Sequence, residues 1–392
     1  MLKDKYDIVI VGGGPAGLNA AFYAAQDNLD VAVMERSREI GIPIRCAEAV
    51  SKNALEEYSF IDDNFISTLI NNVHFIAPNN ELVEMKMDAQ VGYILDRREY
   101  EQTLAKKAAE KSATICTRAH VRGVQQISSA PKLIVDYAGQ QKIVETKLLI
   151  AADGIESNIA PEFGIKTTLS MKNAEACYQM KLTNLEIPEN TLKFWFTNDI
   201  APGGYIWAFP KGPHTANVGL GKGSKSDNSE NTKQRLERFV KRQYPKSSIL
   251  NTSAGGVSVS RGLDELVADH CLVAGDAARM INPLTGGGIA TALWSGKKAG
   301  LIAKQAILDN NTSEKFLEKY EKAWKKEKEK DLKRLFRLKE ALNKLTDEDF
   351  NQLAAKYKDK SPEDVTLTKL FTSALKNKPG LISDVVKLLT GV

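Results

Sequence analysis

The chain has 392 residues and a formal net charge of +5. Its length leaves room for two or three domains with a substantial core, and its ordinary apolar and charged fractions exclude a disordered or fibrous protein. The four cysteines form no CxxC pair, so we expect no disulfide framework, no metal site and a reducing, cytoplasmic location. The chain contains no run of about 18 apolar residues, so we expect no transmembrane segment. The N-terminal apolar run is too short for a signal peptide.

The first predicted elements form a βαβ unit. Residues 6–11 (YDIVIV) make a short apolar run bounded by glycine, which is typical of a buried parallel strand. A helix over 16–26 and a second buried strand over 30–34 follow. Farther along we expect a helix over 97–112, strands and hairpins over 113–127 and 132–151, a half-buried antiparallel sheet over 173–221, a helix over 231–244, a buried strand over 271–276 and a helix from about 287 to 308.

The remainder of the chain is predicted to be helical. One long helix spans roughly 313–345 and has a highly charged middle, KKEKEKDLKR. Thr346 and Asp349 make an acidic variant of the capping box for the next helix. The Ser-Pro pair at 361–362 predicts an N-cap and a first-turn proline for another helix, and Pro379 begins a last one.

A glycine-rich loop follows the first strand. Gly12, Gly14 and Gly17, with Pro15 and Ala16 between them, form a GxGxxG motif. The first glycine makes the turn, the second lets the backbone approach a pyrophosphate, and the third lets helix and strand pack closely. The following helix offers free N–H groups and the positive end of its dipole to phosphates. The loop therefore predicts a dinucleotide site.

Glu35 supports the same interpretation. It stands at the end of the second strand, 23 residues after Gly12, near the spacing of about 20 at which a carboxylate accepts hydrogen bonds from ribose hydroxyls. The alternative is a glycine turn with an unrelated surface glutamate, and the strand–loop–helix context argues against it.

Two later apolar strands end in aspartate beside glycine. The first leads to Asp153 and Gly154, which alone is an ordinary strand-to-turn signal. The second ends at Asp276, which either holds a ribose or ribityl hydroxyl or only caps a helix. The triple glycine at 286–288 then opens a helix whose N-terminus would stabilise the negative charge of a reduced flavin.

The order of these motifs resembles the flavoprotein hydroxylase superfamily. Three segments are more specific and resemble the geranylgeranyl reductase family, including the archaeal digeranylgeranylglycerophospholipid reductases: 43–51 (PIRCAEAVS), 204–221 (GYIWAFPKGPHTANVGLG) and 282–300 (NPLTGGGIATALWSGKKAG). The similarity covers roughly residues 5–310. It implies an FAD-dependent enzyme that saturates isoprenoid double bonds.

The resemblance also implies where FAD is contacted. The arginine contact falls on Arg97 or on the adjacent Arg98. Carried over by position, the implied contacts are Ala16, Glu35, Cys46, Ala47, Ala49, Arg97, Val121, Asp276, Gly288 and Ile289, to which the motifs add Gly12, Gly14, Pro15, Gly17, Asp153, Gly154, Gly286 and Gly287.

The segment Cys46-Ala47-Glu48-Ala49 departs from the CGEG that is usual in the family. Two added methyl groups would hinder a close approach of this backbone to the flavin ring. The local shape of the loop and the identity of the substrate therefore stay undecided. Cys46 is implied to lie beside the flavin, as a proton donor or a redox-sensitive gate. The alternative is a small, packed cysteine.

Tyr205, Trp207 and Phe209 alternate along one predicted strand and therefore share a face. A sheet core explains most of this pattern, but the same face can wall an apolar tunnel for a prenyl chain, which binds through buried CH₂ groups worth about 0.8 kcal/mol each. Reduction of an isolated alkene needs a hydride at one carbon and a proton at the other. The candidate proton donors are Cys46, Tyr205 and Glu48, in that order.

The expected partners are a prenyl lipid or prenyl diphosphate and an external electron donor. Since no second complete nucleotide motif is present, we expect the donor to be transiently bound NADPH or a ferredoxin-like protein. The segment 322–339 is basic with interspersed apolar residues, which suits either a solvated helix face or a peripheral contact with an anionic membrane. No nucleic-acid-binding module is recognisable.

These observations predict an α/β fold with a Rossmann-like ββα-type FAD-binding domain, an antiparallel β substrate domain and a helical C-terminal region. Two rival functions stay open: an aromatic hydroxylase or halogenase on the same fold, and a non-catalytic prenyl-binding carrier, which would not need to retain Glu35 and Asp276. The predicted division is 1–70, 97–165 and 255–312 for the FAD-binding domain, 71–96 and 166–254 for the substrate domain, and 313–392 for the helical region.

Overall fold

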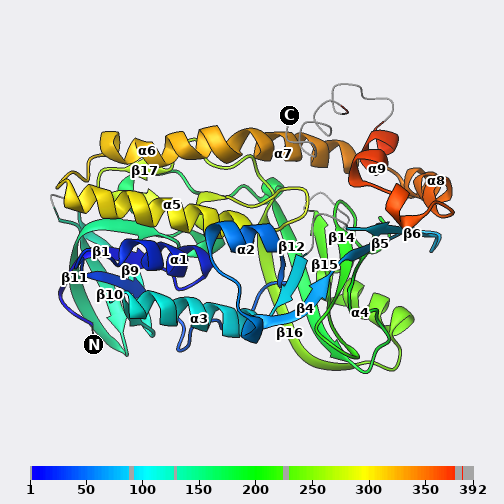
Figure 1. Ribbon diagram of the computed structural model, residues 1–392, viewed down its shortest axis with the longest axis horizontal. Coiled ribbons are helices and arrows are strands. Elements are labelled where there is room, and N and C mark those ends of the chain that lie inside the picture. The colour runs from blue at the N-terminus through cyan, green and yellow to red at the C-terminus, as the bar shows by residue number, and fades with distance from the viewer. Residues whose placement is uncertain (1, 88–91, 128–129, 224–228, 376–381, 383–392) are drawn as a thin grey trace.

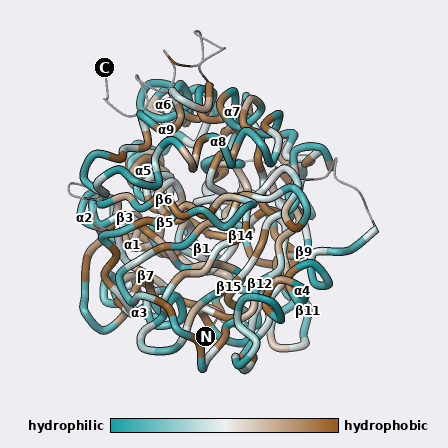
Figure 2. The backbone as a smooth tube through the Cα atoms, turned by 90° about the vertical axis from the view of Figure 1, so that its right-hand side faces the viewer, coloured by the Kyte–Doolittle hydropathy of each residue, from teal (hydrophilic) through white to brown (hydrophobic). Residues whose placement is uncertain are grey.

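The computed structural model describes residues 2–87, 92–127, 130–223, 229–375 and 382. These residues contain an eight-stranded sheet, a seven-stranded sheet and a small three-stranded sheet. Figure 1 shows the first two sheets at opposite ends of the molecule, with α5, α6 and α7 along one side. The hydrophobic and hydrophilic stretches along these elements can be followed in Figure 2.

The predicted βαβ unit is present at the centre of the eight-stranded sheet. Strand β1 (Lys5–Val11) pairs in parallel with β2 (Val31–Met34), and α1 (Pro15–Ala24) connects them. All four residues of β2 are buried, which explains why it reads as an unbroken apolar run. The remaining strands of this sheet are β8 (Thr114–Cys116), β9 (Ala119–Gln126), β10 (Lys132–Tyr137), β11 (Gln140–Ala151), β17 (Val267–Ala268) and β18 (Cys271–Val273).

Helices α1 and α5 (Ile289–Leu308) pack against each other through glycine. A Cβ atom at Gly296 would lie 2.3 Å from the carbonyl oxygen of Ala16, and one at Gly300 would lie 2.4 Å from that of Ala20. Only glycine permits this backbone contact. The helix predicted over 97–112 is α3 (Arg97–Glu110).

The seven-stranded sheet has the order β16-β12-β15-β14-β13-β5-β6. It is mostly antiparallel, as predicted, but β13 pairs in parallel with β5. Because β5 reaches the sheet from a distant part of the chain, no hairpin fixes its direction. The strands are β5 (Asn72–Ile76), β6 (Leu82–Lys86), β12 (Ala174–Thr183), β13 (Thr191–Trp195), β14 (Tyr205–Pro210), β15 (Thr215–Gly223) and β16 (Ser248–Ser258).

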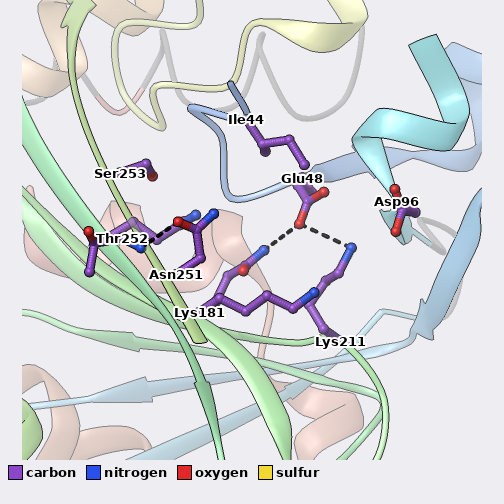
Figure 3. A pocket seen from close by; sticks show the side chains of 10 residues that line it. Ile44, Glu48, Asp96, Lys181, Lys211, Asn251, Thr252 and Ser253 are labelled. Carbon is purple, nitrogen blue, oxygen red and sulfur yellow. Dashed lines mark hydrogen bonds and ion pairs between the residues drawn. The ribbon is translucent and has the colours of Figure 1, made fainter. Parts of the chain in front are cut away.

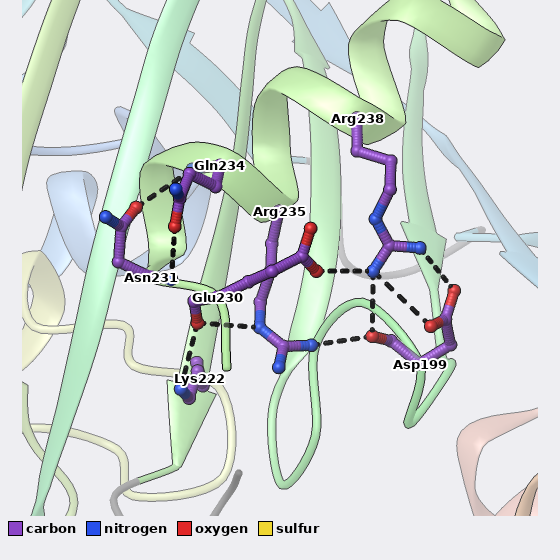
Figure 4. A network of polar contacts seen from close by, with 7 residues as sticks. All are labelled: Asp199, Lys222, Glu230, Asn231, Gln234, Arg235 and Arg238. Atoms are coloured by element: carbon purple, nitrogen blue, oxygen red, sulfur yellow. Dashed lines mark hydrogen bonds and ion pairs between the residues drawn. The ribbon is translucent and has the colours of Figure 1, made fainter. Parts of the chain in front are cut away.

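Helix α4 (Thr232–Gln243) packs on β12 and β15. Asn231 caps it in a reciprocal capping box with Gln234, and Figure 4 shows the polar contacts that hold the next turn of the helix in place. Arg235 and Arg238 both donate to the backbone carbonyl of Asp199, at 2.6 and 3.3 Å. The helix predicted over 231–244 is therefore confirmed.

The predicted long C-terminal helix is present and contains one π-helical turn. We call it the C-terminal rod, and it consists of three consecutive parts: α6 (Glu314–Trp324), the π-helical turn Lys325–Glu329 and α7 (Lys330–Leu342). The π-helical turn coincides with the charged run of the sequence. There Glu327 accepts from the indole nitrogen of Trp294 at 2.9 Å, which ties the rod to α5.

The two cap predictions beyond the rod have different outcomes. Helix α8 (Asp347–Tyr357) begins with the predicted capping box of Thr346 and Asp349. At 361–362, Ser361 and Pro362 do begin a helix as predicted, but it is only a short 3₁₀ helix (Pro362–Asp364), and the Ser361 hydroxyl donates to Glu363 and does not cap it. Helix α9 (Leu367–Ala374) is capped by Thr366 instead. Pro379 lies outside the described residues.

The small sheet is built from strands that alternate along the chain with strands of the two large sheets. It consists of β3 (Ala49–Ser51), β7 (Gly92–Leu95) and β4 (Ile66–Ile70), and α2 (Lys52–Tyr58) follows β3 directly. The predicted substrate domain thus shares its segment 71–96 between two sheets, because β5 and β6 join the large sheet and β7 joins the small one. The division of the chain into domains stays a prediction.

The α1–α5 contact gives a first testable prediction. Gly300→Ala would raise helix propensity by about 1 kcal/mol, but its Cβ has no room against the Ala20 carbonyl. We expect the free energy of unfolding to fall by about 1–3 kcal/mol in urea denaturation followed by circular dichroism. Gly123→Ala is the control, because nothing lies within 4 Å of a Cβ there. Equal stability of the two variants would contradict the packing account.

Candidate functional site

A cavity of about 930 Å³ extends from the glycine loop to the seven-stranded sheet. Its volume lies near the top of the range of about 300–1,000 Å³ that cofactor and ligand pockets occupy. Nearly all of the residues that the sequence singled out line it: Gly12, Gly14, Pro15, Ala16, Glu35, Cys46, Ala47, Ala49, Arg97, Val121, Asp153, Gly154, Tyr205, Trp207, Phe209, Asp276, Gly286, Gly287, Gly288 and Ile289.

The glycine loop has the geometry of a phosphate site. Gly12 has a φ of +107°, and a Cβ there would lie 2.2 Å from the carbonyl oxygen of Ala152. Gly17 does not line the cavity, because it lies against the carbonyl of Gly12 and lets α1 approach β1. Helix α1 begins after Gly14 without a side-chain cap. Its first N–H groups are therefore available to an anion.

Glu35 is fixed at the rim of this loop. Its Oε2 accepts from the backbone nitrogen of Gly13 at 2.8 Å, and its Oε1 accepts from that of Ser37 at 2.7 Å. A carboxylate has about four acceptor positions, so two remain for the hydroxyls of a ribose. The backbone of the glycine loop therefore holds the Glu35 carboxylate at the place that the sequence spacing predicts.

Two aspartates approach the cavity from the ends of neighbouring strands. The Oδ2 of Asp153 accepts from the backbone nitrogens of Asn158 and Ile159, at 2.6 and 3.1 Å, whereas its buried Oδ1 has no partner among the described residues. Asp276 begins the turn after β18, and burial raises its pKa while Arg97 partly lowers it. A buried acceptor without a partner is costly, so the Oδ1 of Asp153 suits a ligand that brings a hydroxyl donor, and the Asp276 carboxyl lines the same cavity.

The triple glycine brings backbone close to Asp276. A Cβ at Gly288 would lie 3.1 Å from the Oδ1 of Asp276. Helix α5 begins at Ile289, again without a side-chain cap. Two uncapped helix N-termini, those of α1 and α5, therefore border one cavity.

A buried charge network holds the loop over residues 46–49, which we call the Cys46 loop. The Glu48 carboxylate accepts from the backbone nitrogen of Arg97 at 2.9 Å and from the amide of Asn217 at 2.6 Å. It also pairs with Lys211 at 3.0 Å, and both side chains are only 4% exposed. Figure 3 shows this pair beside a small polar pocket of about 90 Å³ that shares Glu48 with the large cavity.

This network explains how alanine replaces glycine in the Cys46 loop. The residue in the left-handed region is Glu48, with a φ of +73°, and neither Ala47 nor Ala49 has a positive φ. Both methyl groups pack against the cluster that contains Trp207 and Phe209. The two alanines therefore extend the apolar wall and do not strain the backbone.

Of the two candidate arginines, only Arg97 lines the cavity, and its contact with FAD stays a prediction. Arg97 lines the cavity and its guanidinium binds Glu101, whereas Arg98 is exposed and binds Glu39. Burial lowers the pKa of Arg97, but the Glu101 carboxylate and the Cys46 thiol more than offset this, so the pKa is raised. The Sγ of Cys46 also accepts from the backbone nitrogen of Glu48 at 3.2 Å.

An aromatic wall closes the far end of the cavity. Tyr205, Trp207 and Phe209 share one face of β14, as predicted, and Leu192 and Phe194 of β13 join them. The Phe194 ring centroid lies 5.5 Å from that of Tyr205 and 5.3 Å from that of Phe209. The wall is therefore a continuous apolar surface over two strands.

The wall is anchored by a few polar contacts. The indole nitrogen of Trp207 donates to Gln179 at 3.0 Å, and Gln179 donates to the carbonyl of Cys46 at 2.9 Å. The Tyr205 hydroxyl donates to the carbonyl of Thr285, and burial raises its pKa. Gly219 makes room for the Trp207 ring, which would lie 2.3 Å from a Cβ there. Gly219 of β15 therefore serves packing.

Several cavity residues gave no signal in the sequence. Leu192 and Phe194 looked like any half-buried strand, and Gln179 like a surface residue. Glu175 lies on β12, lines the cavity, and binds Lys339 of the C-terminal rod. A glutamate inside an apolar strand could have drawn attention, but its partner is 164 residues away.

The fold and the site define a flavoprotein with a Rossmann-like nucleotide sheet. Residues 6–186 match the pyridine nucleotide-disulphide oxidoreductase family, and residues 173–257 match the geranylgeranyl reductase catalytic domain. Digeranylgeranylglycerophospholipid reductase 1 of Methanococcoides burtonii is 34% identical over 99% of this chain and 96% of its own length. The chain therefore belongs to the geranylgeranyl reductase family, which confirms the resemblance inferred from the sequence.

Solved structures agree with this assignment. A geranylgeranyl bacteriochlorophyll reductase-like protein from Thermoplasma acidophilum superposes with a TM-score of 0.90 at 31% identity, covering 98% of this chain and 99% of its own. A flavin-dependent brominase superposes with a TM-score of 0.71 at 16% identity, covering 99% of this chain and 94% of its own. The brominase shares the fold alone.

The Glu48 network gives a second prediction. Lys211→Met leaves the Glu48 carboxylate buried without its cation, and breaking a buried pair in this way costs about 3–5 kcal/mol. We expect the urea midpoint to fall accordingly. Lys333→Met removes one partner of an exposed pair with Glu329 and should change stability by less than about 1 kcal/mol. A Lys211 variant as stable as the Lys333 variant would show that the network does not hold the Cys46 loop.

Proposed function

We propose that the chain is an FAD-dependent reductase that hydrogenates the carbon–carbon double bonds of a geranylgeranyl-type lipid. The observation that carries this proposal is the continuity of one cavity from the dinucleotide loop to an apolar aromatic wall. Membership of the geranylgeranyl reductase family supports it. Since the full-length relatives are named digeranylgeranylglycerophospholipid reductases, we propose an ether-lipid substrate of that type ahead of a prenyl diphosphate.

The residues present suit FAD. The uncapped start of α1 and the glycine loop would hold the pyrophosphate, and Glu35 the adenosine ribose. Asp153 and Asp276 offer carboxylates to the remaining hydroxyls, and the start of α5 would face the flavin. When bound, FAD supplies the hydride for alkene reduction.

The protein itself has three tasks in this reaction. The wall of Tyr205, Trp207 and Phe209 binds the prenyl chain, at about 0.8 kcal/mol per buried CH₂ group. The same wall excludes water from the reacting carbons. An acidic group must deliver a proton to the second carbon. Of the candidates inferred from the sequence, Cys46 lines the cavity, Tyr205 already donates to Thr285, and Glu48 is held by three partners.

The rival functions have weaker support. A halogenase or aromatic hydroxylase shares only the fold, and its activity would consume oxygen in step with a halogenated or hydroxylated product. A prenyl carrier has no need for the held Glu35 carboxylate or for the partnerless Oδ1 of Asp153. A purified protein without flavin absorbance would favour the carrier.

Membrane contact and the electron donor stay predictions. Among the described residues no helix has the length and apolar character needed to cross a bilayer. In the basic segment 322–339, several lysines already bind carboxylates of the same rod, such as Lys325 with Glu321 and Lys333 with Glu329. This pairing favours a solvated helix face over an anionic-lipid contact. NADPH and a ferredoxin-like protein are both compatible with the chain.

The third prediction tests the reaction. The protein is reduced with dithionite without oxygen and mixed with a digeranylgeranyl glycerophospholipid or geranylgeranyl diphosphate. We expect the flavin to reoxidise and the product mass to rise in steps of two hydrogens in mass spectrometry. If no prenyl compound reoxidises the flavin, the proposed function is wrong.

The fourth prediction concerns the cofactor. Glu35→Ala removes a charged acceptor for the ribose, and such hydrogen bonds contribute about 1.5–3 kcal/mol, so the Kd for FAD should rise at least about tenfold. Titration of the apoprotein with FAD, followed by flavin fluorescence, measures this change. Glu110→Ala, at the exposed end of α3, should leave the Kd unchanged. A Glu35 variant that binds FAD normally would remove this residue from the site.

A further inference from the structure

A buried ion pair lies in the wall of the cavity at its aromatic end. Glu175 of β12 lines the cavity, and Lys339 of α7 binds it from the C-terminal rod. Both side chains are 10% exposed. Neither residue takes part in holding the cofactor in the account above, so the pair needs another explanation.

The neighbours of Glu175 leave it open toward the cavity. On the adjacent strand β15 stands Gly221, where a Cβ would lie 3.3 Å from the Oε2 of Glu175 and 3.4 Å from the Sγ of Cys177. A side chain at this position would cover both groups. The ionisable or charged groups that face Glu175 are Lys339 from α7, Cys177 from its own strand and Tyr205 from β14.

Several other acidic groups of the cavity are engaged by protein partners or lie away from the aromatic end, and the Cys46 Sγ accepts from the backbone nitrogen of Glu48 at 3.2 Å. Burial raises the pKa of Cys177 to about 12, and the Glu175 charge adds to this. The Tyr205 hydroxyl donates to Thr285, and Glu101 binds Arg97. Asp153 and Asp276 lie at the dinucleotide end, beside Gly154 and the triple glycine.

We infer that Glu175 is the proton donor of alkene reduction and that Lys339 is its positioning partner. The inference rests on the proposed function. As hydride reaches one alkene carbon, the π electron pair forms a C–H bond at the other carbon with the proton of Glu175. The O–H bond breaks, and its electrons stay on the carboxylate. Solvent returns the proton to Glu175 between turnovers, and the external donor restores the hydride equivalent, either as a hydride from NADPH or as two electrons from a ferredoxin-like protein with a second proton from solvent.

The electrostatics of the pair suit this task. Burial raises the pKa of Glu175, and Lys339 only partly lowers it, so the carboxyl holds its proton to higher pH than an exposed glutamate does. Once the proton has left, the carboxylate stands beside an ammonium group in a poorly solvated site. The pair thus favours the protonated acid before the reaction and stabilises its conjugate base afterwards.

The test compares Glu175→Gln and Lys339→Met with Lys333→Met, an exposed position on the same helix. We expect Glu175→Gln to lower the single-turnover rate of prenyl reduction at least about 100-fold, with unchanged FAD content and unchanged substrate-induced flavin spectra. Lys339→Met should shift the fall in rate to higher pH, because the cation that favours the carboxylate is gone. Lys333→Met should behave as the unaltered chain.

A second readout does not depend on activity. Infrared titration of the oxidised protein should show a carboxylic-acid band that is lost with rising pH, is absent in Glu175→Gln and persists to higher pH in Lys339→Met. A merely structural ion pair would change stability but leave no such band.

The outcomes separate the two proposals. If the unaltered protein reduces no prenyl compound, the proposed function fails, whatever the infrared titration shows. If it is active but Glu175→Gln keeps more than a tenth of the rate, or Lys339→Met leaves both pH profiles in place, only the assignment of Glu175 is overturned. Should Glu175→Gln not fold, Lys339→Met decides: both pH profiles must move to higher pH, and profiles left in place overturn the assignment.

Discussion

The backbone contact between α1 and α5 is the constraint on which the site depends. Gly296 and Gly300 let the two helices touch at the carbonyls of Ala16 and Ala20. The contact places the start of α1 against the middle of α5, and so sets the position of the α5 N-terminus relative to the glycine loop, although the two helices are more than 260 residues apart in the chain. Both helix N-termini are uncapped and border the same cavity. The packing of these two helices therefore shapes one site in which the start of α1 can face a pyrophosphate and the start of α5 can face a reduced flavin.

A second constraint joins the nucleotide sheet to the aromatic wall. Residues 46–48 of the Cys46 loop have no regular structure, and the shape of the loop depends on Glu48, which is buried with Lys211, directly after β14, and with Asn217 of β15. Gln179 adds a bridge from the Cys46 carbonyl to Trp207. Burying a carboxylate is costly unless it is fully paired. Because the Glu48 carboxylate is fully paired here, the Cys46 loop and the aromatic wall are held together. We therefore expect a substitution in the loop to change the shape of the wall.

The fold alone does not determine the chemistry. A flavin-dependent brominase shares the architecture at 16% identity, so the same sheets accommodate different reactions. What distinguishes this chain is the wall itself. Five apolar or aromatic side chains from β13 and β14, extended by the methyl groups of Ala47 and Ala49, offer contacts for a long hydrocarbon. The buried pair of Glu175 and Lys339 then adds an acidic group to an otherwise apolar surface.

The features that can be predicted from the sequence are those whose signals are local. The glycine loop, Glu35, the strands ending at Asp153 and Asp276, and the alternating Tyr205, Trp207 and Phe209 follow from spacing and periodicity within short segments. Which distant groups meet depends on the tertiary structure. It places Arg97 and not Arg98 in the cavity wall, gives the left-handed conformation to Glu48 between two alanines, and brings Lys339 to Glu175. Such pairings depend on helix packing and strand order across the whole chain, and no local pattern of residues encodes them.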